Sequence, residues 1–335
     1  MKKTYLLLAI FAAIGSATAW FVATRNPEKS TIVSVDKNFA VQNTDEIEKI
    51  FIADRLGKSV TLQRKKGVWM IDGTNFKVRK TAINVLLETI KKMTVKYVPT
   101  QAATPIIVSE LASIGIKVEI FGQENKKIRS YYIGGVTSDE RGTYMIMDGS
   151  NNPYVMCLPN WEGAFRVRFF LDIDEWRDKT VFEEDVTNIK GLSIEYPASQ
   201  EKSFSILNEN NNFSVQPIDA KYPKSPNEVK KGFIEAYLTG FKSLGAEAFE
   251  NKLTTKDSIR ATTPFCIVQL RRTDGSQKSL RLHAVPTLNG YGDPIKKPDG
   301  SPLVEHFLAE DEKGDFYLIQ QVVFGKILWG YQSFF

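Results

Sequence analysis

Residues 166–178 are the most unusual run of the chain, because four carboxylates and three arginines surround Phe170 and Trp176. Asp172 and Asp174 are two positions apart, and a pair of carboxylates can act together as general acid and base in hydrolysis. The structural alternative is that the carboxylates pair with the arginines while the aromatic rings fill the junction between two halves of the chain. We favour this alternative, since carboxylates in a connecting segment commonly pair with nearby arginines.

A second candidate surface is the loop 287–302, which interleaves prolines and glycines with lysines. Its counterpart at 134–142 is much shorter, and long loops on a rigid sheet often carry recognition. A tolerated insertion would have the same composition. The residues of both segments that we assign to a possible partner or ligand surface are Arg166, Arg168, Asp172, Asp174, Trp176, Arg177, Tyr291, Lys296 and Lys297.

Other chemistries have little support in the sequence. His283 and His306 are the only histidines, and neither has a further ligand at metal-binding spacing. His283 lies in a predicted strand, which favours a packed, hydrogen-bonded core histidine. Ser199 and Lys202 match Ser-x-x-Lys, but the companion motifs of the penicillin-binding enzymes are missing, as are phosphate-cradling glycine loops. We therefore predict no catalytic residue, no cofactor and no metal.

Cys157 and Cys266 fall in predicted strands of different halves of the chain. Export would permit a disulfide between them, but two separate thiols are the favoured interpretation. The C-terminal segment 322–335 is aromatic to its last residue. We expect it to pack as a closing element of the second half, although an exposed patch of this kind would suit a partner or a membrane surface.

The N-terminal sequence predicts the cellular location of the folded part of the chain. Lys2 and Lys3 precede residues 5–23, which contain no charge. As a helix this segment is about 28 Å long, close to the roughly 30 Å hydrocarbon core. The preceding positive charge favours a cytoplasmic N-terminus and a single-pass inner-membrane protein whose remainder lies in the periplasm. Cleavage after Ala19 is the alternative, but the apolar run continues through Trp20.

The remainder of the chain follows one plan twice. Apolar positions of strands and of a helix recur at offsets that grow from 142 to 151 residues, as duplicated units with loop insertions would give. Chance similarity of amphipathic elements is the alternative. The predicted organisation is a cytoplasmic segment 1–4, a transmembrane anchor 5–23, a tether 24–38, a first α+β repeat 39–180 and a second α+β repeat 181–335.

Each repeat is predicted to contain one principal helix, at 78–93 and near 234–244, with strands before and after it. Such grouping favours an α+β fold with mainly antiparallel sheet. The later strands are predicted at 116–121, 128–133, 143–147 and 154–158 in the first copy, and at 266–270, 279–284, 305–309 and 316–319 in the second.

The charge of the chain is balanced. The net charge of +5 falls to +2 when Lys2, Lys3 and Arg25 are set aside. No whole-domain field therefore recruits anionic partners, and we expect no nucleic-acid binding.

Several short sequence motifs occur together with the apolar N-terminus and a tryptophan before the long helix. They are residues 40–41 (AV), 52–54 (IAD), 112–116 (ASIGI), 142–145 (GTYM) and 176–179 (WRDK). In this combination the chain resembles the DUF4340 family, from about residue 30 to the end. The resemblance implies an envelope accessory role, because many members are encoded beside ABC-type transporter components of the gliding-motility kind. It implies no catalytic motif.

Three functions therefore compete. The leading hypothesis is a membrane-anchored periplasmic protein that binds other envelope proteins, among them ABC transporter subunits. The second is a module that binds a small ligand or glycan near Trp176 or at the 287–302 loop. The third, an envelope hydrolase using Asp172 and Asp174, has the least support.

Overall fold

The computed structural model describes residues 37–210 and 212–335. The predicted anchor 5–23, and all but the last two residues of the predicted tether, lie outside them. Over the described part of the chain, no helix has the length and apolar character needed to cross a membrane. Contacts divide the chain into Met1–Arg177, called unit 1, and Asp178–Phe335, called unit 2.

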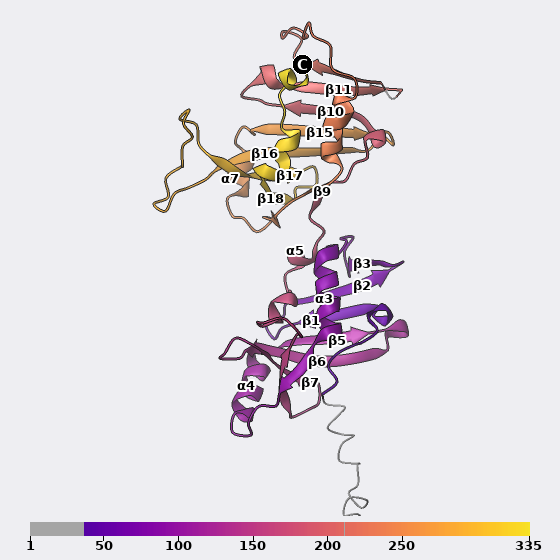
Figure 1. Cartoon of the computed structure of the whole chain (residues 1–335), viewed down its shortest axis with the longest axis vertical. Coiled ribbons are helices and arrows are strands. Elements are labelled where there is room, and N and C mark those ends of the chain that lie inside the picture. Colours follow the sequence, from indigo (N-terminus) through magenta and orange to yellow (C-terminus); the bar gives the residue numbers. More distant parts are fainter. Residues whose placement is uncertain (1–36, 211) are drawn as a thin grey trace, which may run out of the picture. The chain divides into compact units, whose positions relative to one another are not determined.

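Unit 1 is built on one eight-stranded sheet in which all neighbouring strands are antiparallel (Figure 1). The strand order is β3-β2-β1-β5-β6-β7-β8-β4. The strands are β1 (Lys49–Ala53), β2 (Ser59–Lys65), β3 (Val68–Ile71), β4 (Thr94–Tyr97), β5 (Ile116–Phe121), β6 (Lys127–Val136), β7 (Thr143–Met147) and β8 (Pro153–Cys157).

Unit 2 contains a second eight-stranded antiparallel sheet, in the order β12-β11-β10-β15-β16-β17-β18-β14. The order is the same as in unit 1 when β10 is matched to β1. The prediction of two large, mainly antiparallel sheets is confirmed. The strands are β10 (Ile189–Glu195), β11 (Phe204–Glu209), β12 (Asn212–Pro217), β14 (Ala248–Phe249), β15 (Cys266–Arg272), β16 (Gln277–Pro286), β17 (Val304–Asp311) and β18 (Phe316–Gln320), with a separate pair β9 (Thr180–Phe182) and β13 (Leu244–Gly245).

The helices differ from the expectation of one principal helix per copy. In unit 1, α3 (Lys80–Lys92) is the predicted helix, but α4 (Thr104–Ile114) is a second one. The sequence of α4 has no clear amphipathic pattern, because its apolar residues lie on more than one face of the helix: Ile107 is buried while Ile106 is exposed. In unit 2, α6 (Phe233–Leu238) is shorter than predicted and continues as a 3₁₀ turn.

Within the described ranges there are three further short α-helices: α5 (Ile173–Trp176), α7 (Lys256–Arg260) and α8 (Gln321–Phe324). The C-terminal segment that contains α8 is packed, as predicted. Its aromatic residues Phe324, Tyr331 and Phe334 are buried in the hydrophobic cluster of unit 2.

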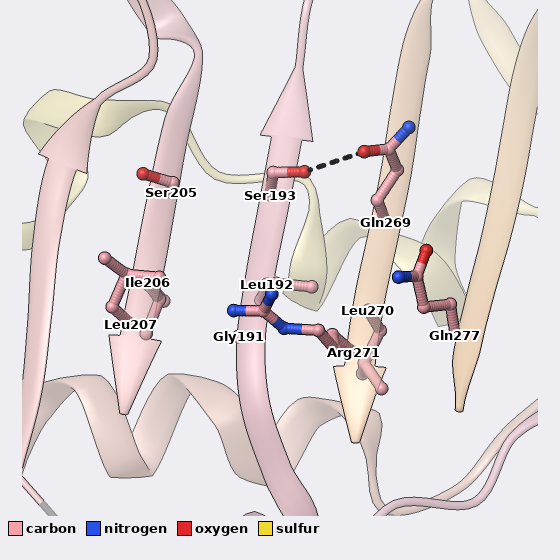
Figure 2. Close-up of a pocket in the computed structure, with 10 residues that line it drawn as sticks. All are labelled: Gly191, Leu192, Ser193, Ser205, Ile206, Leu207, Gln269, Leu270, Arg271 and Gln277. Atoms are coloured by element: carbon pink, nitrogen blue, oxygen red, sulfur yellow. Dashed lines mark hydrogen bonds between the residues drawn. The ribbon is translucent and has the colours of Figure 1, made fainter. Parts of the chain in front are cut away.

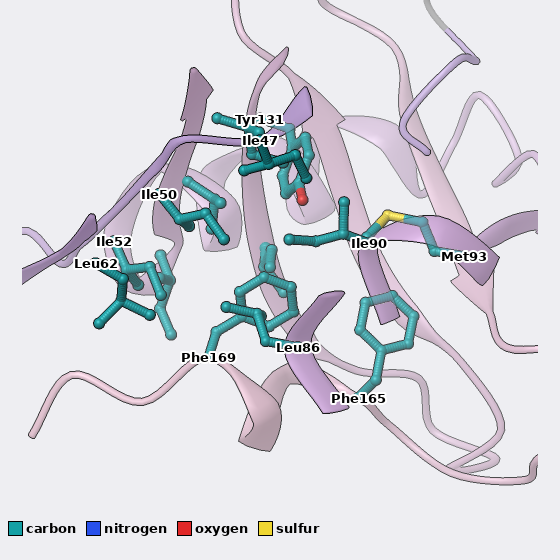
Figure 3. Packing of buried hydrophobic residues seen from close by; sticks show 14 of the residues in the cluster. Ile47, Ile50, Ile52, Leu62, Leu86, Ile90, Met93, Tyr131, Phe165 and Phe169 are labelled. Atoms are coloured by element: carbon teal, nitrogen blue, oxygen red, sulfur yellow. The ribbon is translucent and has the colours of Figure 1, made fainter. Parts of the chain in front are cut away.

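Each unit buries its own hydrophobic cluster. Figure 3 shows that of unit 1, where Leu86 and Ile90 of α3 pack toward Ile50 on the sheet. Strand β1 alternates buried and partly exposed residues, so one face of the sheet forms the core and the other is the outer face. Unit 2 has a cluster of its own, in which Phe241 after α6 is buried and meets Phe182 of β9 edge to face at 5.3 Å.

Because the two clusters are separate, a core truncation should act on one unit. We expect Leu86→Ala to destabilise unit 1 by about 2–5 kcal/mol and Phe241→Ala to destabilise unit 2 by about 3–5 kcal/mol, since each leaves a cavity in a buried cluster. Calorimetry of the full chain should show each variant lowering a different transition. The exposed Leu56→Ala is the control, and an equal shift of both transitions by either core variant would contradict the prediction.

Candidate functional surfaces

The arginines of the 166–178 segment tie elements of unit 1 together. Arg166 donates through Nη1 to the carbonyl oxygen of Ile133 at 2.6 Å and through Nη2 to that of Ile114 at 2.7 Å. It thereby links the C-terminal end of α4 to β6. Arg168 donates to the Thr89 hydroxyl at 3.0 Å, and its guanidinium lies 4.5 Å from the centre of the Trp161 ring. Both are therefore positioned by contacts within the unit.

The two aspartates of this segment stand at α5. Asp172 is its N-cap residue and accepts a hydrogen bond from the backbone N–H of Asp174 at 3.2 Å. Asp174 forms an ion pair with Arg177 at 3.1 Å. The Arg177 side chain is 8% exposed, and its guanidinium stacks 3.8 Å from the centre of the Phe76 ring. These contacts are a helix cap and an ion pair between a nearly buried arginine and a partly exposed aspartate, both local to α5.

Trp176 is buried in the core of unit 1. Its indole Nε1 donates to the carbonyl oxygen of Phe170 at 3.0 Å, and the two rings meet edge to face at 5.1 Å. The Trp176 carbonyl oxygen accepts from the backbone N–H of Arg79, ahead of α3. The side chain thus holds the end of the segment in the core, and it is not exposed on the outer surface of the unit.

The second candidate surface, the predicted loop 287–302, extends in the structure to residue 303, and residues 287–303 are called the arm. It joins β16 to β17 and projects beyond them (Figure 1). Backbone hydrogen bonds of 2.7–2.8 Å run from Ile295 to Thr287 and from Leu303 to Ile295, so the arm folds back on itself in three lengths. Two Asx turns close its bends: Asn289 accepts from the backbone of Tyr291, and Asp299 from that of Ser301.

The arm exposes the predicted surface residues at its two bends. Tyr291 is 94% exposed, and Lys296 and Lys297 are also exposed. Leu288, another exposed apolar residue, is 56% exposed. A large aromatic ring held at the tip of a hydrogen-bonded loop suits contact with a partner, because little conformational freedom is lost on binding.

A further feature, which the sequence did not suggest, is a hollow on the outer face of the unit 2 sheet (Figure 2). Its volume is about 210 Å³. Gly191 in β10 lines it and is itself buried, and a Cβ at this position would be in ordinary contact with Arg271 Nη2 at 3.7 Å and Leu207 Cδ2 at 3.8 Å. The polar residues around it are Ser193, Ser205, Gln269, Arg271 and Gln277.

The register of the strands arranges these side chains in two rows. One row crosses five strands and contains only uncharged polar residues, namely Gln216, Ser205, Ser193, Gln269 and Ser279. In the next row, Gly191 lies between Leu207 and Arg271. The hollow therefore combines hydroxyl and amide groups with one guanidinium.

Unit 1 shows what this position looks like when it is filled. Ile50 and Ile52 of β1 match Leu192 and Ile194 of β10 in the pairing with β5 and β15, so Lys49 occupies the position of Gly191. The Lys49 ammonium lies 4.1 Å from the centre of the Phe121 ring, at the position of Arg271. At matching positions of the two sheets, the Lys49 side chain thus covers the surface of unit 1, whereas unit 2 has a hollow.

A polar cluster lies where α7 covers the outer face of unit 2. Arg260 pairs with Glu310 at 2.6 Å. The Thr262 hydroxyl donates to the Ile259 carbonyl oxygen and lies 3.0 Å from Nδ1 of His283, so this nitrogen is assigned as the donor to it. His283 is 6% exposed, and burial lowers its pKa. Nearby Glu310 acts against this shift, and Arg281 adds to it. The predicted packed, hydrogen-bonded histidine is confirmed.

The two cysteines are free thiols. Cys266 is buried, and desolvation raises its pKa to about 12, which makes the thiolate scarce at neutral pH. Cys157 is half-buried. Among the residues that the structure describes, no three His, Cys, Asp or Glu side chains are grouped to hold a metal ion.

The chain matches the model of one known protein family. The model of DUF4340, a domain of unknown function, matches residues 69–264, from β3 of unit 1 to just before β15 of unit 2. The chain belongs to the DUF4340 family. No curated protein and no solved structure matches it.

The buried neutral histidine predicts a pH dependence. The pKa of His283 is lowered in the folded chain, so between that value and about 6.5 the unfolded chain binds more protons. Stability contributed by His283 is therefore present above about pH 6.5 and is lost as the pH falls below it. Denaturant midpoints at pH 7.5 and 5.5 should differ less in His283→Asn than in the wild type. His306→Asn is the control, and an unchanged difference in His283→Asn would contradict this.

Proposed function

We propose that this protein is a membrane-anchored interaction protein of the periplasm, accessory to an ABC-type envelope transport or gliding-type system. Residues 5–23 would hold it in the inner membrane. The observation that carries the proposal is the arm, in which an ordered double bend presents Tyr291 almost fully to solvent.

The form of the arm supports recognition over a passive insertion. A passive insertion needs no internal order, whereas the arm has a backbone hydrogen bond between each neighbouring pair of its three lengths. Lys296 and Lys297 are exposed where the second bend of the arm begins and give this part of the arm positive charge. We expect a partner surface with an apolar cleft for the tyrosine ring and acidic groups around it.

The test is site-specific photo-cross-linking of the full-length protein in native membranes. A photoreactive amino acid at position 291 should give discrete adducts with envelope proteins, and transporter subunits are the expected products. The same amino acid at Leu56, which is 89% exposed on unit 1, is the matched control. Adducts that are absent at 291, or identical at both positions, would overturn the arm as the contact element.

A second candidate function, the binding of a small ligand, is favoured by the hollow at Gly191. Arg271 can bind a carboxylate, and the serine and glutamine side chains can bind hydroxyl groups. A sugar acid has both kinds of group. The comparison with Lys49 supports this candidate, because the equivalent position in unit 1 is covered by a side chain.

Thermal shifts measured with D-glucuronate, and with D-glucose as the uncharged control, test the second candidate. We expect a rise in the unfolding temperature with glucuronate that is lost in Arg271→Gln and in Gly191→Lys. The lysine fills the hollow as Lys49 does in unit 1, and the site has room for its Cβ. An equal rise in all three proteins, or none in the wild type, would exclude a sugar-acid site.

A further inference from the structure

The two sheets begin with the same hairpin but differ in how its edge is covered. In unit 1, Lys65 of β2 pairs with Val68 of β3 across a two-residue turn. In unit 2, Glu209 of β11 pairs with Asn212 of β12 at the same spacing. In a hairpin with a two-residue turn, the two residues that flank the turn form backbone hydrogen bonds with each other. Counting away from the turn, the next residue of each strand and every second residue after it direct their backbone N–H and C=O groups away from the partner strand.

In unit 1 the outward groups of β3 are bonded. The backbone N–H of Ile71 donates to the carbonyl oxygen of Phe76 at 3.0 Å, and that of Val78 donates to the carbonyl oxygen of Trp69 at 2.9 Å. Residues 76–78 therefore lie along β3 as an extended segment and cover this edge of the sheet.

In unit 2 the matching positions are Phe213 and Val215. Across the described ranges 37–210 and 212–335, no backbone hydrogen bond reaches either residue from the outer side of β12. The backbone N–H of Ile218 donates to the carbonyl oxygen of Ser203, which continues the pairing of β12 with β11 by one more residue and adds no bond on the outer side of β12. The edge of this sheet is thus open where that of unit 1 is closed.

We propose that β12 pairs antiparallel with β12 of a second copy of this chain. With Ser214 on the two-fold axis, Phe213 of each copy lies opposite Val215 of the other. Each such pair exchanges two backbone hydrogen bonds, so four bonds satisfy every outward N–H and C=O of the two residues. The two sheets then continue as one.

The side chains of β12 suit this self-pairing. Phe213 meets Val215, an aromatic and a β-branched residue, on one face. On the other face Ser214 meets Ser214, and Asn212 meets Gln216. The strand from Asn212 to Gln216 carries no charge, so two copies do not repel each other. Exposed edges are usually protected by a charged residue, a proline or a bulge; β12 ends in Pro217, which limits the pairing to the residues before it, and the absence of a charge among them favours a second copy over a partner chosen by charge.

The contact is small. A stable interface usually buries about 1,600 Å², more than one strand pair provides, so we expect weak association that depends on concentration. This inference goes beyond the proposed function and does not rest on it, because the arm leaves the sheet between β16 and β17 and not at β12.

The first test is a cysteine at the two-fold axis. Ser214 would face its own copy as a non-hydrogen-bonded pair with Cα atoms about 4.5 Å apart, within the range of a disulfide. Full-length Ser214→Cys in detergent should form a disulfide-linked dimer under mild oxidation. Ser59→Cys, an exposed serine in a strand of unit 1, is the matched control, and the wild type shows the background from its two native cysteines. Equal yields at 214 and 59 would overturn the proposal.

Analytical ultracentrifugation supplies the second test. We expect the wild type to dimerise with rising concentration and Ser214→Lys, which places two lysines face to face, to remain monomeric. Tyr291→Ser should dimerise like the wild type, so failure of the arm proposal and failure of this one are distinguishable. A wild type that is monomeric throughout, a Ser214→Lys variant that still dimerises, or a different protein occupying β12 would each overturn the pairing.

Discussion

The alternation of buried and exposed residues along the central strands is the constraint on which the other features depend. In β10, Leu192 and Ile194 point into the core, and Ser193 and Gly191 lie on the opposite face, where Ser193 is half-buried and Gly191 is buried under its neighbours. A slip of one residue against either neighbour would expose the core set and bury the polar set. The same alternation determines which residues of β11 and β15 pair with each residue of β10. This pairing in turn determines the polar row, the position of the hollow and which backbone groups of β12 point outward. Core packing thus determines the outer surface.

Within this shared frame, the two units differ at corresponding places. Lys49 covers the position that Gly191 leaves open. Residues 76–78 close the edge that remains open at β12. Even the outer helices differ, since α4 packs on its sheet through an apolar cluster, whereas α7 does so through the Arg260–Glu310 ion pair. At these two places unit 1 is covered by its own side chains and backbone, and unit 2 presents the openings to which we assign binding.

Most of the fold could be predicted from the sequence because its strands and its long helix are determined by residue patterns within short segments. Period-two patterns bounded by turn residues placed the ends of the later strands within three residues, and the α3 pattern placed the long helix. The predicted arm residues are exposed, but Trp176 is buried, since composition alone does not say which way an aromatic ring points. The hollow and the open edge were missed because they depend on cross-strand neighbours. A glycine inside a strand was the one available signal for the hollow.

The hollow and the open edge belong to one polar surface. Ser205, which lines the hollow, pairs with Gln216 on β12, and directly paired residues share a face of the sheet. A second copy added at β12 would therefore extend the polar outer face beyond Gln216 without covering the hollow, because a strand added at an edge lies in the plane of the sheet. The arm leaves from the opposite side of β10, two strands away. Self-association, ligand binding and partner recognition can thus occupy one sheet of unit 2 through different groups.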